Sequence, residues 1–448
     1  MIRDERYNKY MDYVPKINSK AEERYIKKRK YRAFINSLCF YICRIFPIDN
    51  NLVSVCTFEG RGGFGCNPKY IIKELHKQKP ECKIVWFVND MTKEFPDYIK
   101  KVPNTLTSRA YWLSKSKVWI DNYRKPYGTK KRKGQYYINT WHANMGFKTI
   151  GLLRGEAFSY MAYLVSKNDS EMIDDVVVDS DYCETMFRKG LVYNGHFLKV
   201  GQPRCDILHG DRSQYIKKFR KKHNLPLEAK VVMYAPTFRE DAKDGKRTVF
   251  SEAWTIDFER LLENLEKKFG GYWYLCLRVH PQLAGAFKEY KNDRLNGKII
   301  DESQADDMYE ILAGMDAFVT DYSSAAFDAS ETDMPVFIYA DDIEKYMNDR
   351  GSLLWELSDD TDKPVRNNPD VEPDIHAVLP FPVAKNNDEL ENRIQEFDSQ
   401  MYNKKIMLFR MSEGLMMESK ASESVVKEIV KTGKKGMSDG TCSKKEYK

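Results

Sequence analysis

The chain has 448 residues, of which 42% are apolar, 13% are aromatic and 31% are charged. This composition excludes an intrinsically disordered chain, and the length predicts two domains rather than one. The 73 basic and 66 acidic residues leave a net charge of only +7, which does not indicate a nucleic-acid-binding protein.

Residues 1–50 are predicted to form a basic amphipathic helical extension. Six basic residues precede FINSLCFYICRIF, where Ile35, Leu38, Ile42 and Ile45 recur at helical spacing. That segment is 13 residues long, whereas a membrane-spanning helix needs about 20 apolar residues. Two interpretations remain open: contact with an anionic membrane surface, or packing of the helix on the next domain.

From Asn51 onward, short apolar runs alternate with helical segments. LVSVCTF, KIVWFV, KVWIDN, YYINTWH and DVVVDS are predicted strands, and NPKYIIKELHK is a predicted crossover helix. This alternation is typical of a mostly parallel sheet with helices on both faces. Residues 51–194 are therefore predicted to form a first Rossmann-like domain.

A second series of strands is predicted to begin near residues 192–195. Its members are HFLKV, VVMYAP, WYLCLRVH, GKII, AFVT and PVFIYA, with helical segments such as DDMYEILAG between them. Residues 195–385 are predicted to form a second Rossmann-like domain, followed by carboxy-terminal helices over 386–431 and a disordered tail over 432–448. The predicted fold class is α/β, with two Rossmann-like domains facing a cleft.

The cysteines and histidines are scattered singly. The nine cysteines form no CxxC pair, and no Cys/His cluster has metal-ligand spacing, so no metal site is predicted. The polar opening MIRDERYNKY does not resemble a signal peptide. These features predict a cytoplasmic protein with reduced cysteines, which would be peripheral on the inner face of the cell membrane if the amino-terminal helix binds lipid.

In open α/β sheets, ligands bind beyond the carboxyl ends of the strands. The sequence TWHANMGFKTIG follows the predicted strand YYIN and places His142 at such an end. A histidine, with an ordinary pKa of about 6.5, is suited to abstract a proton at cellular pH. The alternative is a hydrogen-bonded structural histidine.

Two further strand ends carry groups that suit a phosphate. YAPTFRED places Thr237, with a hydroxyl and a backbone N–H, after one strand. In LRVHPQL, the alternation of a strand puts Arg278 and His280 on the same side. The alternative for LRVHPQL is a strand end that frays into solvent.

The segment FVTDYSSAAFD runs from a strand into a helix. Ser323 and Ser324 are predicted to open this helix, where serine is a preferred cap and unpaired N–H groups attract anions. Asp328 would lie one turn later. The glycine-rich EGRGGFG, by contrast, lacks the GxxxxGK[ST] and GxGxxG patterns and is predicted to be a flexible loop without a phosphate-binding fingerprint.

Taken in order, these motifs resemble the CDP-glycerol glycerophosphotransferase family of teichoic acid synthesis. The resemblance covers about residues 53–383. It rests on FEGRGGFGCNPKYIIKEL, INTWHANMGFKTIG, VGQPRCDIL, YAPTFRED, LRVHPQL, DMYEILAGMDAFVTDYSSAAFD and DDIEKYMNDRGSLLWEL. It implies a GT-B-like architecture, with acceptor chemistry on the first domain and the CDP donor on the second.

The resemblance also implies an activity. A family member would transfer glycerol phosphate or ribitol phosphate from CDP-glycerol or CDP-ribitol to a hydroxyl of a lipid-linked teichoic acid or capsule precursor, and would release CMP. No cofactor is implied, because the CDP-polyol is a substrate. Two alternatives remain: a GT-B glycosyltransferase that uses a nucleotide sugar, and a non-catalytic assembly protein.

The family pattern assigns roles to residues of this sequence. The implied catalytic residues are His142, as general base, and His280, which would contact the diphosphate. The implied residues for binding of substrate and CDP are Trp141, Ala143, Asn144, Met145, Arg204, Pro236, Thr237, Arg278, Val279, Ser323, Ser324 and Asp328.

One motif departs from the family. The usual sequence is TWHGTPLKKIG, whereas this chain has TWHANMGFKTIG, which is one residue longer. Ala143, Asn144 and Met145 stand where the family has Gly, Thr and Pro, while His142 and Lys148 remain. The resemblance therefore implies activity and leaves the polyol and the acceptor open.

Overall fold

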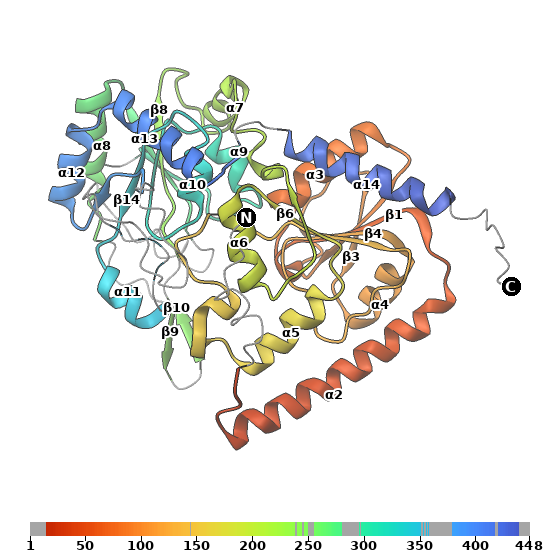
Figure 1. Cartoon of the computed structure of the whole chain (residues 1–448). Helices are drawn as coiled ribbons and strands as arrows, with labels where there is room; N and C mark the ends of the chain where they lie inside the picture. The colour runs from red at the N-terminus through yellow and green to blue at the C-terminus, as the bar shows by residue number, and fades with distance from the viewer. Residues whose placement is uncertain are drawn as a thin grey trace, which may run out of the picture. The chain divides into compact units, whose positions relative to one another are not determined.

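The structure, a computed structural model, divides into two compact units (Figure 1). Unit 1 comprises residues 1–142, 150–206 and 418–448, and unit 2 comprises residues 143–149 and 207–417. The residues that the structure describes are 15–143, 145–237, 240–243, 246–249, 255–279, 295, 297–350, 353, 355, 357, 379–416 and 420–438.

Unit 1 is built on a seven-stranded parallel sheet. The predicted strands LVSVCTF, KIVWFV, KVWIDN, YYINTWH and DVVVDS are confirmed. The order of the strands reverses between the first and the fourth along the chain, which places a topological switch point at their carboxyl ends. In spatial order the strands are β3 (Ile99–Pro103), β2 (Lys83–Val88), β1 (Asp49–Cys56), β4 (Ser116–Asp121), β5 (Tyr136–Asn139), β6 (Asp175–Val178) and β7 (His196–Lys199).

The position of β7 corrects one prediction. HFLKV was expected to open the second series of strands, but β7 pairs in parallel with β6 in the first sheet, from Asp175↔His196 to Val178↔Lys199. A helix lies between these two strands, so they form one ordinary βαβ unit. A βαβ unit can be predicted from local sequence pattern, but the sheet that its last strand joins cannot.

Helices cover both faces of the first sheet. This agrees with the near-continuous apolar character of its central strands, whose successive side chains point to opposite faces. The α-helices of unit 1 are α2 (Lys20–Ile42), α3 (Cys66–Gln78), α4 (Leu106–Lys115), α5 (Tyr160–Ser170), α6 (Asp181–Gly190) and α14 (Ala421–Ser438). Its 3₁₀-helices are η1 (Cys43–Ile45), η2 (Phe58–Gly60), η3 (Gly151–Ala157) and η4 (Pro203–Cys205).

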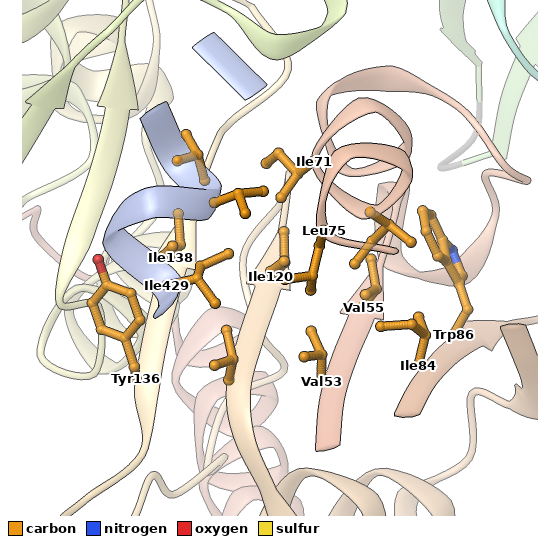
Figure 2. Packing of buried hydrophobic residues seen from close by; sticks show 14 of the residues in the cluster. Val53, Val55, Ile71, Leu75, Ile84, Trp86, Ile120, Tyr136, Ile138 and Ile429 are labelled. Carbon is orange, nitrogen blue, oxygen red and sulfur yellow. The ribbon is translucent and has the colours of Figure 1, made fainter. Parts of the chain in front are cut away.

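One face of the sheet packs against α3 and α14. Figure 2 shows Ile71 and Leu75 of α3 beside Val53 and Ile120 of the strands, with Ile429 of α14 in the same cluster. The carboxy-terminal helix therefore completes the core of unit 1. The opposite face packs against α2 and α4 through Phe40, Leu52, Phe87, Leu113 and Trp119.

The carboxy-terminal helix is longer than expected. A disordered tail was predicted over 432–448, but α14 continues to Ser438. Its buried apolar residues Val425, Val426 and Ile429 lie in the first three turns, and the mostly polar residues that follow resemble a tail in the sequence. Residues 439–448 lie outside the described residues.

Unit 2 contains a six-stranded parallel sheet. The predicted strands VVMYAP, WYLCLRVH, GKII, AFVT and PVFIYA are confirmed, and the order reverses between the first and fourth of them. In spatial order they are β12 (Ile299–Asp301), β11 (Trp273–Leu277), β8 (Lys230–Tyr234), β13 (Ala317–Thr320), β14 (Val336–Tyr339) and β15 (Val383–Ala384). Its other elements are the hairpin β9 (Glu240–Lys243) and β10 (Lys246–Val249), and helices α7 (Ser213–Lys222), α8 (Phe258–Phe269), α9 (Met308–Leu312), α10 (Ala325–Ala329), α11 (Ile343–Arg350), α12 (Asn387–Gln395) and α13 (Ser399–Ser412).

Helix α2 is held to unit 1 by the loop between β4 and β5. The Asn36 side-chain amide donates to the Tyr127 carbonyl oxygen at 3.0 Å, and the Ser37 hydroxyl donates to the Gly128 carbonyl oxygen at 2.8 Å. Gly128 has a φ of +87°, and a Cβ atom there would lie 2.2 Å from the carbonyl oxygen of Ala33. Only glycine permits this close approach.

Helix α2 packs on unit 1 through a different face from the predicted apolar stripe. The buried face is formed by Ile26, Ala33, Asn36 and Phe40. The predicted stripe of Ile35, Leu38, Ile42 and Ile45 is exposed. Among the described residues, no helix is long and apolar enough to cross a bilayer.

The packing of α14 predicts that Ile429→Ala destabilises unit 1. The Ile429 side chain is 5% exposed, and removing such a side chain leaves a cavity that costs about 2–5 kcal/mol. Urea denaturation followed by tryptophan fluorescence should show this loss in free energy of unfolding. Lys427→Ala, at an exposed position of the same helix, should change stability by less than about 0.5 kcal/mol. Equal stability of the two variants would contradict the packing.

Candidate active site

His142 lies three residues beyond the end of β5. The loop that carries it begins with Asn139, whose side-chain oxygen accepts a hydrogen bond from the Trp141 backbone N–H at 2.8 Å. Trp141 is 5% exposed and has a φ of +48°. The left-handed backbone conformation of Trp141 turns the chain sharply. The next side chain, His142, therefore lies at the carboxyl end of the strand.

The imidazole of His142 has a defined tautomer. Its Nδ1 lies 2.7 Å from the backbone carbonyl oxygen of Asn122. A carbonyl oxygen can only accept, so Nδ1 carries the proton and Nε2 has a free lone pair. Asn122 follows β4, and its side-chain oxygen accepts from the Phe58 backbone N–H, after β1, at 2.8 Å. His142 is thus fixed at the switch point of the first sheet.

Aromatic rings surround the imidazole. Trp141 and Tyr123 stack on it with ring centroids 4.7 and 5.3 Å away, and Phe58 meets it edge-on at 5.4 Å. Phe58, Glu59, Cys66 and Trp141 all have positive φ angles, which cost energy in residues other than glycine. Such strained residues cluster at functional sites, and the ring contacts of two of them, Phe58 and Trp141, with His142 favour a functional over a purely structural histidine.

Burial sets the charge of His142. Loss of hydration is the largest effect and, together with the guanidinium groups of Arg204, Arg124 and Arg61, lowers its pKa to about 4, whereas the hydrogen bond to Asn122 acts in the opposite direction. A group with this pKa is neutral at pH 7. The neutral form is the one that can accept a proton, so the geometry and the charge state both suit a general base.

Asn67, at the start of α3, forms side-chain hydrogen bonds to the loops that carry Trp141, Gln202 and Arg204. Its side chain is fully buried; its amide nitrogen donates to Gln202 Oε1 at 2.6 Å, and its oxygen accepts from the Arg204 backbone N–H at 3.1 Å. The same amide nitrogen lies 3.4 Å from the carbonyl oxygen of Trp141. Arg204 is 1% exposed and donates through Nη1 to the carbonyl oxygen of His142 at 2.8 Å. In this structure Arg204 therefore positions the histidine loop.

A second buried network supports the loop after β4. Lys125 and Asp121, each with a side chain 3% exposed, form an ion pair at 2.7 Å. The Lys125 backbone N–H donates to Asp169 at 3.1 Å, and burial raises the pKa of Asp169 to about 7. No local sequence pattern indicated Asn67, Asn122 or Asp169, because their partners come from distant segments.

The glycine-rich loop is more ordered than predicted. The backbone N–H of Gly60 donates to the Thr57 carbonyl oxygen at 2.9 Å, and Thr57 Oγ1 donates to the Gly63 carbonyl oxygen at 3.1 Å. A Cβ atom at Gly62 would lie 2.7 Å from Thr57 Oγ1. These glycines allow tight folding against Thr57, so the expectation of a flexible loop is wrong.

In unit 2, Thr237 lies at the corresponding switch point. It follows β8 and the half-buried Pro236, and its backbone N–H and hydroxyl donate to the carboxylate of Asp321, after β13, at 2.7 and 3.0 Å. Because β8 and β13 are the strands where the order reverses, Thr237 and Asp321 mark the place where ligands of open α/β sheets bind.

Arg278 and Val279 lie at the carboxyl end of β11, as predicted. The Arg278 guanidinium donates to the carbonyl oxygen of Glu302, and burial lowers its pKa. Val279 is 3% exposed, and its N–H donates to Ser303 Oγ at 3.1 Å. The strand end is therefore held in place and does not fray. His280 lies outside the described residues.

The start of α10 differs in detail from the predicted cap. Ser324 occupies the cap position without a side-chain capping bond, and Ser323 Oγ instead accepts from the Ala325 N–H at 3.3 Å. Asp328 is 1% exposed and accepts a hydrogen bond from the Tyr309 hydroxyl at 2.5 Å. This carboxylate thus has a structural partner within unit 2.

The segment after His142 belongs to unit 2. Ala143 is half-buried, Met145 is fully buried, and Asn144 lies outside the described residues. The Trp355 indole N–H donates to the Gly146 carbonyl oxygen at 3.1 Å, and the ring of Phe147 lies 4.8 Å from that of Phe327. The residues that depart from the family pattern are therefore part of the unit that carries Thr237 and Arg278.

Comparisons with known proteins agree on one family. The family model described as CDP-glycerol:poly(glycerophosphate) glycerophosphotransferase matches residues 38–431. A teichoic acid poly(glycerol phosphate) polymerase of Staphylococcus epidermidis is 28% identical over 72% of this chain and 45% of that protein. A teichoic acid poly(ribitol-phosphate) polymerase of Bacillus spizizenii is 25% identical over 94% of this chain and 63% of that protein. This chain thus spans less than two thirds of either relative.

A solved structure shows the same fold. The wall teichoic acid polymerase TagF superposes with a TM-score of 0.71 at 24% sequence identity, over 92% of this chain and 98% of that one. This similarity confirms the predicted GT-B-like class with two Rossmann-like domains.

The hydrogen bond of His142 predicts a measurable protonation state. In ¹⁵N NMR of protein with labelled histidine, His142 should be neutral at pH 5.5 with the proton on Nδ1, because its pKa is lowered to about 4. The spectrum of His142→Asn identifies its signal among those of the seven histidines. Half-protonation near the ordinary value of about 6.5 would contradict the lowered pKa. A proton on Nε2 of the neutral ring would contradict the assigned tautomer.

Proposed function

The chain belongs to the CDP-glycerol:poly(glycerophosphate) glycerophosphotransferase family, and on that premise we propose that it transfers a polyol phosphate from a CDP-activated donor to a hydroxyl of a lipid-linked teichoic acid or capsule precursor. The observation that carries the proposal is the neutral His142, whose Nδ1 is bound to the Asn122 carbonyl oxygen and whose Nε2 is left to accept a proton. The family match favours this activity over the nucleotide-sugar alternative.

The proposed reaction is one phosphoryl-group transfer. Nε2 of His142 takes the proton of the acceptor hydroxyl as its oxygen attacks the phosphorus that bears the polyol. A new phosphodiester bond forms, and the bond from that phosphorus to the bridging oxygen breaks. The electron pair of the broken bond remains on CMP, which leaves. General-base assistance of this kind contributes roughly 10²–10⁴-fold to the rate.

Unit 2 is proposed to bind the donor. Thr237 lies at the switch point of its sheet, where its N–H and hydroxyl donate to Asp321, while Arg278 and Ser323 lie at or just beyond neighbouring strand ends. Phosphoryl transfer depends mainly on positioning and on electrostatic stabilisation of the diphosphate. Fixed cations and donors supply both, so the proposal requires no resident cofactor. His280 and Asn144 keep their predicted roles in this proposal.

Glycerol phosphate and ribitol phosphate are both candidates for the transferred unit. The relatives named above include a glycerol-phosphate and a ribitol-phosphate polymerase. The residues that depart from the family motif, Ala143 to Met145, directly follow the proposed base. We therefore infer that this segment contributes to the choice of polyol or acceptor.

We also propose that the protein is peripheral on an anionic membrane surface. From Tyr31 onward, the exposed apolar residues of α2 fall within an arc of about 120° at 3.6 residues per turn. Lys20, Arg24 and Lys27 extend the same face toward the amino terminus, where Lys27 is paired with Glu23, so a mainly cationic half of the helix precedes an apolar half. The exposed apolar residues in this arc are Tyr31, Phe34, Ile35, Leu38, Tyr41 and Ile42, whereas Tyr25 is also exposed but lies outside it.

His142→Asn should abolish transfer while the protein stays folded. CMP release from CDP-glycerol or CDP-ribitol, in the presence of a lipid-linked acceptor extract, should fall by roughly 10²–10⁴-fold because the proton acceptor is lost. His196→Asn is the matched control, since His196 is an exposed residue of β7 paired with Asp175. Near-native turnover of His142→Asn would remove this residue from the mechanism.

The exposed face of α2 predicts the effect of a double substitution on membrane binding. Phe34→Asp with Leu38→Asp should weaken binding to vesicles of anionic phospholipid by at least about tenfold, because burial of each side chain contributes about 1.5–3 kcal/mol. Leu227→Asp with Tyr272→Asp changes two exposed apolar residues elsewhere and should leave binding unchanged. Equal binding of both double variants would contradict the membrane role of α2.

A further inference from the structure

A small cationic pocket lies between α2 and α4 of unit 1. Its volume is about 170 Å³, which is below the range of about 300–1,000 Å³ that is typical for drug-sized ligands. A pocket of this size suits a phosphate or diphosphate group rather than a nucleotide. It is lined by Arg29, Arg32, Ala33, Asn36, Leu106, Arg109, Pro126 and Tyr127.

The lining contains three guanidinium groups and no carboxylate among the described residues. Arg29 and Arg32 form no ion pair within the described part of the chain. Glu59, which interacts electrostatically with Arg29 and Arg109, is itself paired with Arg61 at 2.7 Å. Positive charge at this pocket is therefore only weakly compensated, and guanidinium groups bind phosphate oxygens in pairs.

Two buried polar atoms of the lining have no partner among the described residues. Arg109 donates through Nη1 to Asn104, but its buried Nε makes no hydrogen bond. Asn36 is 4% exposed, and its Oδ1 accepts none, although its amide nitrogen donates to Tyr127. Buried groups of this kind are rare in folded proteins and indicate a ligand or bound water. Both atoms are covered by their neighbours, so an anion in the pocket binds Arg109 Nε only if the lining side chains shift.

The pocket adjoins both the exposed face of α2 and the loop that holds the proposed base. Arg32 and Ile35 are three residues apart, so they are neighbours on the helix surface, with Arg32 at the pocket and Ile35 on the exposed apolar face. Pro126 and Tyr127 belong to the loop that begins at Asn122, the residue bound to His142. A ligand here can place a phosphate in the pocket and an apolar chain along α2.

We propose that this pocket binds the phosphate or diphosphate group of the lipid-linked acceptor. The inference rests on the proposed function and deepens it, because it names the part of the acceptor that the protein recognises. Arg29, Arg32 and Arg109 contact the phosphate oxygens, and the apolar face of α2 receives the first part of the lipid chain. The acceptor hydroxyl is thereby brought to the unit that carries His142.

Farnesyl diphosphate, a soluble lipid diphosphate, is the probe that tests the proposal. Calorimetric titration of the full chain should show binding at least tenfold tighter than that of inorganic pyrophosphate or farnesol, because both ends of the probe contribute. The double substitution Arg29→Ala with Arg32→Ala should weaken the binding of farnesyl diphosphate tenfold or more. Lys28→Ala with Lys30→Ala removes the same charge from exposed positions of the same helix and should change it by less than twofold.

Several outcomes would overturn the proposal. Equal weakening in the two double variants would show general attraction to a basic helix, and equal affinity for pyrophosphate would show that the lipid chain is not recognised. Binding to phosphatidylglycerol vesicles that depends on Arg29 and Arg32, without binding of farnesyl diphosphate, would assign the pocket to bulk lipid headgroups. Urea denaturation curves of both variants that match that of the wild-type protein serve as the control for folding.

The test separates this inference from the proposed function. If the wild-type protein releases CMP but does not bind farnesyl diphosphate, the proposed transferase function stands and the proposed acceptor pocket is wrong. If the protein binds farnesyl diphosphate through Arg29 and Arg32 but releases no CMP from any CDP-polyol, the lipid-phosphate site stands and the proposed function is wrong.

Discussion

Asn122 makes the two hydrogen bonds on which the candidate site depends. Its backbone carbonyl oxygen binds Nδ1 of His142, and its side-chain oxygen binds the backbone N–H of Phe58. One residue at the switch point of the first sheet thus joins the ends of β1 and β4 to the loop after β5. If that carbonyl turned away, Nδ1–H would lack its partner and the tautomer with a free Nε2 would no longer be fixed.

Two opposing effects act on the charge of His142, and burial is the larger. The hydrogen bond to Asn122 raises its pKa, but desolvation and three arginines lower it to about 4. Such a histidine is always neutral at cellular pH, although it is a weak base by itself. Anionic substrates would raise its pKa while bound, because negative charge stabilises the imidazolium. The surrounding arginines therefore suit both anion binding and control of the base.

The sequence predicted the parts of the site that lie at strand ends, since apolar runs reveal strands and Rossmann-like folds bind ligands at their carboxyl ends. His142, Thr237 and Arg278 were found in this way. Asn67 and Asn122 were missed because each acts through contacts between distant segments. The sheet of β7 and the order of the glycine loop were predicted wrongly for the same reason: pairing and close packing are tertiary properties that local pattern does not show.

Transfer of the polyol phosphate is tested most directly by ³¹P NMR of the complete reaction with CDP-glycerol or CDP-ribitol and a lipid-linked acceptor. If transfer occurs, the two diphosphate signals are replaced by equal amounts of a CMP monoester signal and a new phosphodiester signal. Release of free polyol phosphate as a monoester would show hydrolysis instead of transfer. Persistence of the diphosphate signals with both donors, beside an acceptor preparation shown to be active, would contradict the proposed function.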